Sequence, residues 1–472
     1  MTKFRRSIAL LVALTIILTF ALAQAAPAST VQNVRMSQTP EKVRVVLDMT
    51  AVPEFNVTLE TDPFRLLVDM PAAVDKNVLR QLALNDPFVS SVQIQEPEAG
   101  KVRVAVNLAM TVRHSVFKLT NPNRLVIDLF KEFEQKSEQE IKPGIKYTSW
   151  LKSQPYGPIK ASILQIDPKA GCVIRPVLSN GAVQGLETLV AMSAGARAIA
   201  AVNGSYFAPN GEIIGLLKIK GEIISSTSIP RTALGVFPDG RLAFAPVSWQ
   251  GYVELPGGRV TLSGVNRSRG DDELILYTGY FGPSTGTNPY GVEYVIGGDG
   301  RVASIGNANT AIAAGSVVLS AHGTAAKELA GLRVGDVAYV QQSLGPEWDA
   351  AVHVLGAGPM LVKDGTIYLT TKTEGFGSDV AGGRAPRTAV GITKDGKIIL
   401  VVVDGRHASS AGMSLLDLAL FMQELGAVDA MNLDGGGSSE MVVFDKVVNR
   451  PSDGRERKVA TALVVIPASI AN

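Results

Sequence analysis

The sequence contains few cysteine and histidine residues. Among 472 residues there is one cysteine, Cys172, and there are four histidines, at positions 114, 322, 353 and 407. A single cysteine cannot form an intramolecular disulfide, and the scattered histidines lack the spacing of zinc ligands. The sequence therefore excludes a disulfide-stapled scaffold and predicts no zinc site of the histidine or cysteine type. A lone thiol is a candidate nucleophile in principle, but Cys172 lies at the start of a predicted strand, so we expect it to be buried.

An excess of charge of one sign is also missing. Lysine and arginine number 45, aspartate and glutamate 43, and the formal net charge is +2. Binding to nucleic acid requires a strongly basic surface, so we expect no nucleic-acid partner. The composition is that of a globular protein, with 46% apolar and 19% charged residues. The length predicts two or three domains, and the 47 glycines indicate a turn-rich, strand-rich fold.

Long apolar runs are absent except near the start of the chain. Basic residues precede an apolar stretch from Ile8 to Leu22, and small residues with A-x-A spacing follow it. This pattern predicts a cleaved signal peptide over residues 1–25, with an uncleaved anchor as the alternative. No later segment is long and apolar enough to cross a bilayer. We therefore expect a secreted or cell-envelope protein without a membrane span after cleavage.

The region after this segment repeats itself, since residues 42–71 recur as residues 101–130. Each copy alternates apolar and polar residues, then turns into a short apolar run, as strands do. Two copies that each expose one apolar face should pack together, so we expect a small all-β sandwich over residues 30–131. Asp69 and Asp128 occupy equivalent positions in the two copies, which indicates a structural role. The polar, charged residues 132–143 that follow are predicted to be a linker.

The repeated region resembles the AMIN domain, a β-module found at the front of exported amidases and secretin-type proteins. The resemblance implies binding to peptidoglycan or another envelope polymer, and an inert β-spacer is the alternative.

Residues 144–472 predict a larger, mixed α+β domain built around a central sheet. A strand over 198–202 ends in Asn203-Gly204, which places an amide side chain at a sheet edge or forms a plain turn. Arg231-Thr232-Ala233 and Arg387-Thr388-Ala389 each precede an Asp-Gly hairpin turn. Two arginines in equivalent positions suit bidentate binding of one anion, and surface salt bridges are the alternative.

The densest group of functional candidates lies between residues 398 and 441. An apolar strand over 398–403 ends in Asp404-Gly405-Arg406, and Ser414-x-x-Asp417 predicts a capped helix to about Leu425. The following strand ends in Asp434-Gly435-Gly436-Gly437-Ser438. Glycines after an aspartate allow close backbone approach and present amides to an anion, although a mobile turn is the alternative. The lysine of a P-loop and the spacing of a Rossmann fingerprint are both missing.

Together these residues resemble the phosphodiester glycosidase family, whose animal member removes N-acetylglucosamine from a phosphodiester. The resemblance rests on the following segments: 203–207, 386–391, 404–406, 410–412, 432–439 and 449–452. Glu440 departs from the family, in which threonine is more usual at that position.

The resemblance implies a hydrolase that cleaves the sugar–phosphate bond of a glycan phosphodiester, such as one in an envelope glycan or teichoic-acid-like polymer. Catalysis should require carboxylates at the anomeric carbon and cations or amides at the phosphate. We expect Asp404 and Asp434 to flank the anomeric centre and Arg231, Arg387 and Arg406 to hold the phosphate with the amides of Gly435, Gly436 and Gly437. Asn203 and Asn432 would orient sugar hydroxyls or the loop. Gly204 and Ser438, beside them, would also bind the substrate. Glu440 and His407 are secondary candidates for handling a proton.

Several alternatives stay open at this point. No cofactor is required, but Asp404, Asp434 and nearby carbonyls could bind a divalent cation such as calcium. A non-catalytic glycan-binding envelope protein would bind saccharide without forming product. A metal-dependent phosphodiesterase would cut the P–O bond instead of the sugar C–O bond.

Overall fold

The structure of the chain is a computed structural model that describes residues 29–39, 41–131, 133–154 and 156–470. The chain divides into two units, Met1–Phe133 and Glu134–Asn472. The predicted signal peptide at 1–25 lies outside the described residues. Within the described residues, no helix combines the length and apolar character that a membrane crossing requires.

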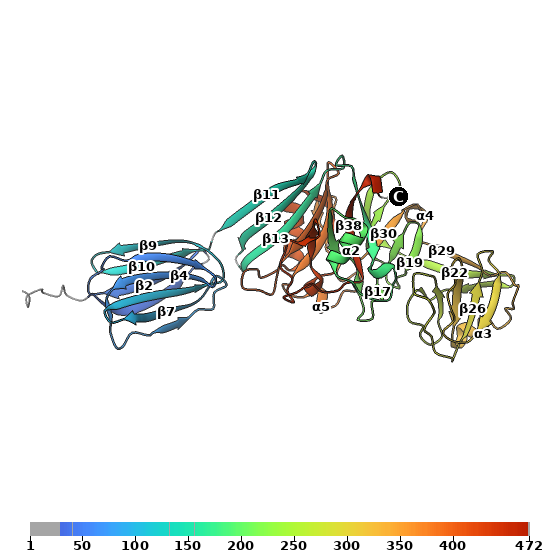
Figure 1. The fold of residues 1–472 in the computed structure, drawn as a ribbon, viewed down its shortest axis with the longest axis horizontal. Coiled ribbons are helices and arrows are strands. Elements are labelled where there is room, and N and C mark those ends of the chain that lie inside the picture. The colour runs from blue at the N-terminus through green and yellow to red at the C-terminus, as the bar shows by residue number, and fades with distance from the viewer. Residues whose placement is uncertain (1–28, 40, 132, 155, 471–472) are drawn as a thin grey trace, which may run out of the picture. The chain divides into compact units, whose positions relative to one another are not determined.

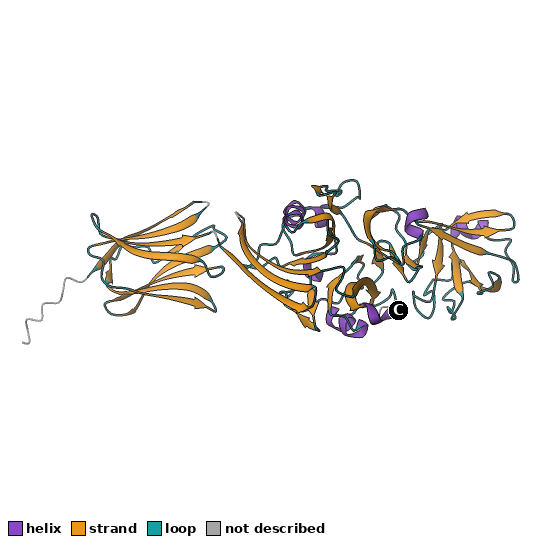
Figure 2. Cartoon of the chain, turned by 90° about the horizontal axis from the view of Figure 1, so that it is seen from above, coloured by secondary structure: helices purple, strands orange, loops and turns teal. Residues whose placement is uncertain are grey.

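The first unit consists of two five-stranded sheets (Figures 1 and 2). The first sheet has the order β5-β1-β2-β10-β9, with bounds Ala73–Val74, Thr30–Gln38, Lys42–Met49, Arg124–Phe130 and Arg113–Leu119. The second has the order β3-β4-β8-β7-β6, with bounds Asn56–Thr61, Phe64–Pro71, Lys101–Leu108, Val89–Glu98 and Gln81–Ala83. Apolar residues on alternate positions of β2 and β8 are buried, as the sequence period requires.

The repeated copies exchange strands between these sheets. Strand β2 of the first copy pairs with β10 of the second, and β8 of the second copy pairs with β4 of the first. Each pairing is joined by an ion pair across the copies. Arg44 donates to both carboxylate oxygens of Asp128 at 2.6 and 2.7 Å, and Arg103 does the same to Asp69 at 2.7 and 2.8 Å. The sequence repeat is therefore a structural repeat, with each sheet built from both copies.

The predicted linker at 132–143 is wrong for most of its length. Residues Glu134–Lys142 form strand β11, which pairs with β12 (Ile145–Gln154) at the edge of the largest sheet. The strand carries almost no apolar side chains and is exposed, which is why its composition indicated a linker. An edge strand needs only backbone hydrogen bonds on one side, and charged side chains protect its free side from pairing with another chain.

The expected mixed α+β domain around a central sheet is also wrong. The protein is mostly β, with 50% of residues in strands and 9% in helices, and its strands form many sheets (Figure 2). Short apolar segments separated by glycine favour β-hairpins over helices. In the structure, the strands that the sequence predicts belong to several separate sheets and not to one central sheet. The expected helix does form: α6 (Leu415–Glu424) begins with a complete Ser414–Asp417 capping box.

The largest sheet of the second unit has eight strands, with the order β11-β12-β13-β34-β33-β35-β31-β32. Its further strands have the bounds Gly157–Ile166, Ile398–Val403, Arg387–Thr393, Ala427–Asn432, Met360–Lys363 and Thr366–Ile367. Alternate residues of β34 pack into two different cores, so the strand is covered on both faces as predicted. Leu400 and Val402 face a core shared with other sheets, whereas Ile399 and Val401 face helix α6.

Two five-stranded sheets complete the shared core. One has the order β14-β38-β15-β36-β37, with bounds Cys172–Leu178, Thr461–Pro467, Ala200–Asn203, Met441–Val443 and Lys446–Val447. The other has the order β19-β18-β30-β20-β21, with bounds Glu222–Ser225, Leu217–Ile219, His353–Gly356, Arg231–Val236 and Leu242–Val247. Helix α2 (Leu189–Ala196) covers the first of them. Strands β16 (Tyr206–Phe207) and β17 (Ile213–Ile214) form a small separate hairpin that follows β15. Cys172 is only partly buried, and burial raises the pKa of its thiol.

Residues 250–343 leave the second of these sheets after β21 and return before β30, and we call them the inserted module. They form a three-stranded and a five-stranded sheet with an apolar core of their own. The strand bounds are Gln250–Leu255, Gly258–Thr261, Gly264–Val265, Leu274–Tyr277, Val292–Ile296, Val302–Gly306, Val317–Ala321 and Tyr339–Ser343. The short helices of this unit are α3 (Gly323–Glu328), α4 (Pro346–Asp349) and α5 (Ser378–Ala381).

Candidate active site

The candidate site forms where strands β33, β34 and β35 meet the end of β15. Both β34 and β35 pair with β33, so Asp404 and Asp434, which follow them, flank the start of β33. Two strand spacings separate their backbones, which is about 10 Å. The sheet order therefore places the two predicted carboxylates at one edge of the sheet, on either side of Arg387.

Asp404 is buried, with 5% of its surface exposed. Its Oδ1 accepts hydrogen bonds from the Asn449 side chain at 3.1 Å and from the backbone amide of Arg450 at 2.9 Å. Burial raises the pKa of this carboxyl, and the two hydrogen bonds oppose that rise. None of the described side chains forms a salt bridge with it.

Asp434 begins the glycine loop. Its Oδ1 accepts a hydrogen bond from the amide of Gly435 at 2.8 Å, and its backbone amide donates to the Gly204 carbonyl at 3.0 Å. Loss of solvation raises the pKa of Asp434 to about 6, and hydrogen bonds from Ser438 and Gly435 limit this rise. At neutral pH this carboxyl is mostly ionised yet remains a usable proton acceptor.

The three glycines contribute space more than free amides. The Gly435 amide is bonded to Asp434, and the Gly436 amide donates to the Pro386 carbonyl at 2.9 Å. A Cβ at Gly436 would lie 3.3 Å from Nη2 of Arg406, and one at Gly437 would collide with the guanidinium of Arg457. The run of glycines thus allows two arginine side chains to lie directly on the loop.

Arg406 and Arg387 differ sharply in surroundings. Arg406 is exposed, has a left-handed φ of 59°, and has no hydrogen-bond or ion-pair partner among the described residues. Arg387 is 3% exposed, and its guanidinium donates to the carbonyls of Met413, Val380 and Gly383 at 2.9, 3.0 and 3.3 Å. Burial lowers the pKa of Arg387, and the charge of Arg406 lowers it further. Arg406 is therefore free to meet a ligand, whereas Arg387 fixes the surrounding loops.

The two predicted asparagines form hydrogen bonds between separate segments of the site. Asn203 donates to the Asp434 carbonyl at 2.6 Å, while its Oδ1 accepts from Thr388 at 2.7 Å and from the Glu440 amide at 3.2 Å. Asn432 donates to the Tyr206 hydroxyl at 2.8 Å. Gly204 follows Asn203 where a Cβ would press on Thr461, so glycine is required by close approach. Asn203 thus connects the start of the glycine loop to β33 and to the segment before β36.

Arg231 lies on the far side of Tyr206. Its guanidinium stacks on the Phe376 ring at 4.3 Å, and Nε donates to the Glu374 carbonyl at 3.3 Å. The Phe376 ring in turn lies 5.7 Å from the ring of Tyr206. Burial raises the pKa of the Tyr206 hydroxyl, and Asp434, Arg387 and Arg231 all act on it electrostatically. Tyr206 therefore lies close to the charged residues of the site.

Several residues of this site received no role from sequence reasoning. They are Tyr206, Phe376, Asn449, Arg450 and Arg457. Asn449 and Arg450 stand in one of the segments on which the family resemblance rests, so their bonds to Asp404 could have been anticipated. Phe376 and Arg457 carry no local signal, because chain segments far apart in sequence bring them to the loop.

The two secondary candidates differ in exposure. His407 is exposed, contacts Ser409 at 2.8 Å and Arg450 at 3.3 Å, and partial burial lowers its pKa. Glu440 is buried with neither carboxylate oxygen hydrogen-bonded, and burial followed by the nearby Glu456 raises its pKa to about 8. Across the described residues, no group of three or more histidine, cysteine, aspartate or glutamate side chains is arranged to hold a metal ion.

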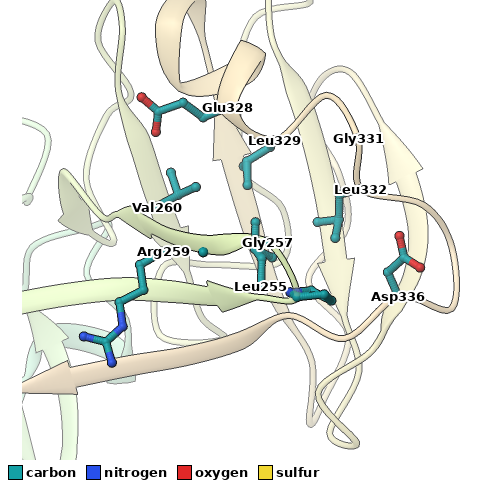
Figure 3. Close-up of a pocket in the computed structure, with 11 residues that line it drawn as sticks. Leu255, Gly257, Arg259, Val260, Glu328, Leu329, Gly331, Leu332 and Asp336 are labelled. Carbon is teal, nitrogen blue, oxygen red and sulfur yellow. The ribbon is translucent and has the colours of Figure 1, made fainter.

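A separate cavity of about 740 Å³ lies within the inserted module (Figure 3). Leu255, Leu329 and Leu332 contribute apolar surface, and Arg259, Glu328 and Asp336 are charged lining residues. None of the predicted site residues lines it, so this cavity is distinct from the candidate site.

Family models match both units. Residues 50–129 match the AMIN domain, and residues 290–466 match the phosphodiester glycosidase family. Both resemblances inferred from the sequence are therefore confirmed for these segments. The second segment includes Arg387, Asp404, Asp434 and the glycine loop, but not Asn203 or Arg231.

Individual relatives match shorter segments. Over 81 residues the chain is 43% identical to the SPbeta prophage-derived uncharacterized protein YomE of Bacillus subtilis, covering 17% of this chain and 12% of that protein. Over 111 residues it is 32% identical to the N-acetylglucosamine-1-phosphodiester alpha-N-acetylglucosaminidase of Mus musculus, covering 22% and 21%. The matched segments span about an eighth and a fifth of these two curated relatives.

A solved structure extends the likeness to nearly the whole chain. The crystal structure of a hypothetical protein from Synechocystis covers 93% of this chain and 80% of its own, with a TM-score of 0.65 and 25% identity. The arrangement of strands described above is therefore shared by a protein of known structure.

Proposed function

We propose that the second unit is a phosphodiester glycosidase, which hydrolyses the bond between a sugar and the phosphate of a sugar-1-phosphodiester. The observation that carries the proposal is the pairing of two strand-end carboxylates, Asp404 and Asp434, with arginines lying on a glycine loop. Among the described residues, neither carboxylate forms a salt bridge with an arginine side chain, and Arg406 has no anionic partner. Arg457, the other arginine on the loop, is paired with Asp453 at 2.7 Å. Unpaired charges of both signs at one sheet edge suit a substrate with a cationic transition state and an anionic leaving group.

The reaction requires little acid assistance, because the leaving group is a phosphate monoester. Water attacks the anomeric carbon, its proton passes to a carboxylate, and the C–O bond breaks to release sugar and phosphate monoester. Asp434, with a pKa of about 6, is the carboxylate best suited to take that proton. The second oxygen of Asp404 faces the developing positive charge of the sugar, and Arg406 and Arg457 stabilise the growing charge of the phosphate.

Hydrolysis of synthetic sugar-1-phosphodiesters in ¹⁸O-labelled water tests this function. We expect label in the released sugar, because the C–O bond breaks. Label in the phosphate would instead indicate a phosphodiesterase, and saccharide binding without any product would indicate a glycan-binding protein. An arm with EDTA determines whether a divalent cation takes part.

For the first unit, we infer that it holds the enzyme at an envelope polymer such as peptidoglycan, outside the cytoplasm. The AMIN match and the basic, apolar start of the sequence support this location. Full-length Asp434→Asn protein should sediment with purified peptidoglycan sacculi. Equal sedimentation with an unrelated insoluble polysaccharide would contradict specific binding.

A further inference from the structure

The two arginine-threonine-alanine motifs of the sequence hold one and the same segment of the chain. Arg231 and Arg387 both donate to backbone carbonyls of residues 370–383, which we call the bridging segment. Arg231 contacts the Glu374 carbonyl at 3.3 Å, and Arg387 contacts the Val380 carbonyl at 3.0 Å. The two arginines begin strands of different sheets, β20 and β33. The bridging segment is therefore attached to both of these sheets.

Glu374 adds a third attachment through its side chain, which is 1% exposed. Its carboxylate accepts hydrogen bonds from the amide and hydroxyl of Thr232 at 2.9 and 2.5 Å, from the Thr370 hydroxyl, and from the Met360 amide at 3.4 Å. It also packs closely on Gly358, where a Cβ would lie 2.3 Å from Oε2 of Glu374. One buried carboxylate thus joins the bridging segment to β20 and to the start of β31.

Two contacts of Tyr206 depend on this carboxylate. The Phe376 ring, two residues after Glu374, lies 5.7 Å from the Tyr206 ring. The Tyr206 hydroxyl donates to the Gly358 carbonyl at 3.0 Å and accepts from the Asn432 side chain at 2.8 Å. Glu374 therefore fixes the residue that packs on the ring and the residue that holds the hydroxyl.

We propose that Glu374 is a positioning residue of the candidate site, whose carboxylate fixes the bridging segment so that Phe376 and Arg231 stand correctly beside Tyr206. The carboxylate is buried and surrounded by donors of the protein, so it acts through these neighbours and not on the substrate itself. The inference rests on the proposed function, because it names a support of that same site. A displacement of active-site groups by about 1 Å can reduce the rate by roughly 10²-fold.

Hydrolysis of the methyl diester of N-acetylglucosamine-1-phosphate by variants of Glu374 tests the proposal. Glu374→Ala should lower kcat/KM by about tenfold to a hundredfold. Glu374→Gln should retain most of the parent value, because its amide can still accept from the Thr232 amide and can donate to the threonine hydroxyls. A carboxylate that transferred a proton would instead lose its function in both variants.

Glu293→Ala is the matched control. Glu293 is 0% exposed, and its carboxylate likewise accepts from threonine hydroxyls, those of Thr285 and Thr287, and from the backbone amide of Thr310. These partners all belong to the inserted module, and none of them is a residue of the candidate site. The control should lower the melting temperature as Glu374→Ala does, but kcat/KM of the folded protein should not change.

A double variant shows whether Glu374 acts through Phe376. Phe376→Ala removes the ring that Glu374 positions, so adding Glu374→Ala to it should cause little further loss of kcat/KM. Independent, multiplying losses would overturn the inference.

Equal kcat/KM for Glu374→Ala and Glu293→Ala would reduce Glu374 to a residue that only stabilises the fold, and an equal loss in Glu374→Gln and Glu374→Ala would contradict positioning. Thr232→Val removes only the hydroxyl contact and should give a smaller loss in the same direction. This variant decides the question if Glu374→Ala does not fold, because parent-like turnover would then overturn the inference. A parent protein that cleaves no sugar-1-phosphodiester refutes the proposed function, whereas an active parent with unaffected Glu374 variants refutes this inference alone.

Discussion

Aspartates of the two units stand in opposite electrostatic surroundings. In the first unit, Asp69 and Asp128 each accept two hydrogen bonds from an arginine, and these bonds lower the pKa of both carboxyls. In the second unit, neither Asp404 nor Asp434 forms a salt bridge with a described arginine side chain, and burial raises the pKa of both. All four lie in or directly after strands, so the difference arises from the partner and not from the strand.

This contrast distinguishes carboxylates that stabilise the fold from carboxylates available for chemistry. A paired carboxylate gains more from its arginine than it loses on burial, so it favours folding. An unpaired buried carboxylate costs free energy of folding, and such costs gather at functional sites. The comparison supports a structural role for the first pair and a catalytic role for the second.

The largest expected effect is that of Asp434→Asn on turnover. An amide cannot accept the proton, so kcat should fall by at least about 10²–10³. The asparagine oxygen can still accept the Gly435 amide, so the melting temperature should stay the same or rise. In the parent enzyme, kcat/KM should increase with pH up to a plateau above about 6, the pKa of Asp434. Turnover near the parent value would remove Asp434 from the mechanism.

A smaller loss is expected from Gly437→Ala. The added methyl group would collide with the guanidinium of Arg457 and with Oδ1 of its partner Asp453, so this ion pair has to move off the loop. Losing one cation near the phosphate should lower kcat/KM by about tenfold. Gly195→Ala in helix α2 is the control, since nothing lies within 4 Å of its added Cβ. If the two alanine variants have equal kcat/KM, Arg457 plays no part.

Some of this arrangement could be predicted from the sequence because the signals are local. The capping box of α6, the two Asp-Gly hairpins and the double burial of β34 follow from spacing and apolar period alone. The internal repeat of the first unit could also be predicted, because residues 42–71 recur as residues 101–130. The strand ends at Asp404 and Asp434 could likewise be placed, since an apolar strand that stops at Asp-Gly has a clear end.

The remainder depends on contacts between distant segments. Arg231 and Arg387 begin equivalent strands with the same motif, yet carbonyls from 380–383 and 413 surround only Arg387. The division of strands among many sheets depends on pairing partners that the apolar period does not specify, which is why the mixed α+β prediction failed. Strand β11 was missed because an exposed edge strand has the composition of a linker.

A more modest effect is expected in the first unit from Asp128→Asn. Asp128 is 4% exposed and accepts from Arg44 and Lys42, so the substitution weakens three charge-assisted hydrogen bonds. The free energy of unfolding of this unit should fall by roughly 1–3 kcal/mol. Turnover of the diester should not change, which makes the variant a counterpart of Asp434→Asn. A loss of kcat would contradict the separate roles of the two pairs.

The smallest effect is a difference in how the two units respond to pH, observed as two calorimetric transitions of the full chain. Lowered pKa values at Asp69 and Asp128 give stability that is present above about pH 4 and lost below it. Raised pKa values have the opposite effect: they give stability that is present at low pH and is lost as pH rises. The folded second unit binds protons at Asp434 and Glu440 up to about pH 6 and 8, so its stability should fall as pH rises from about 4 to 8. Glu440→Gln should flatten the upper part of that slope, because a neutral amide has no proton to lose. Parallel pH dependence of the two transitions would mean that the unpaired carboxylates are stabilised by contacts as strong as the arginines of the first unit.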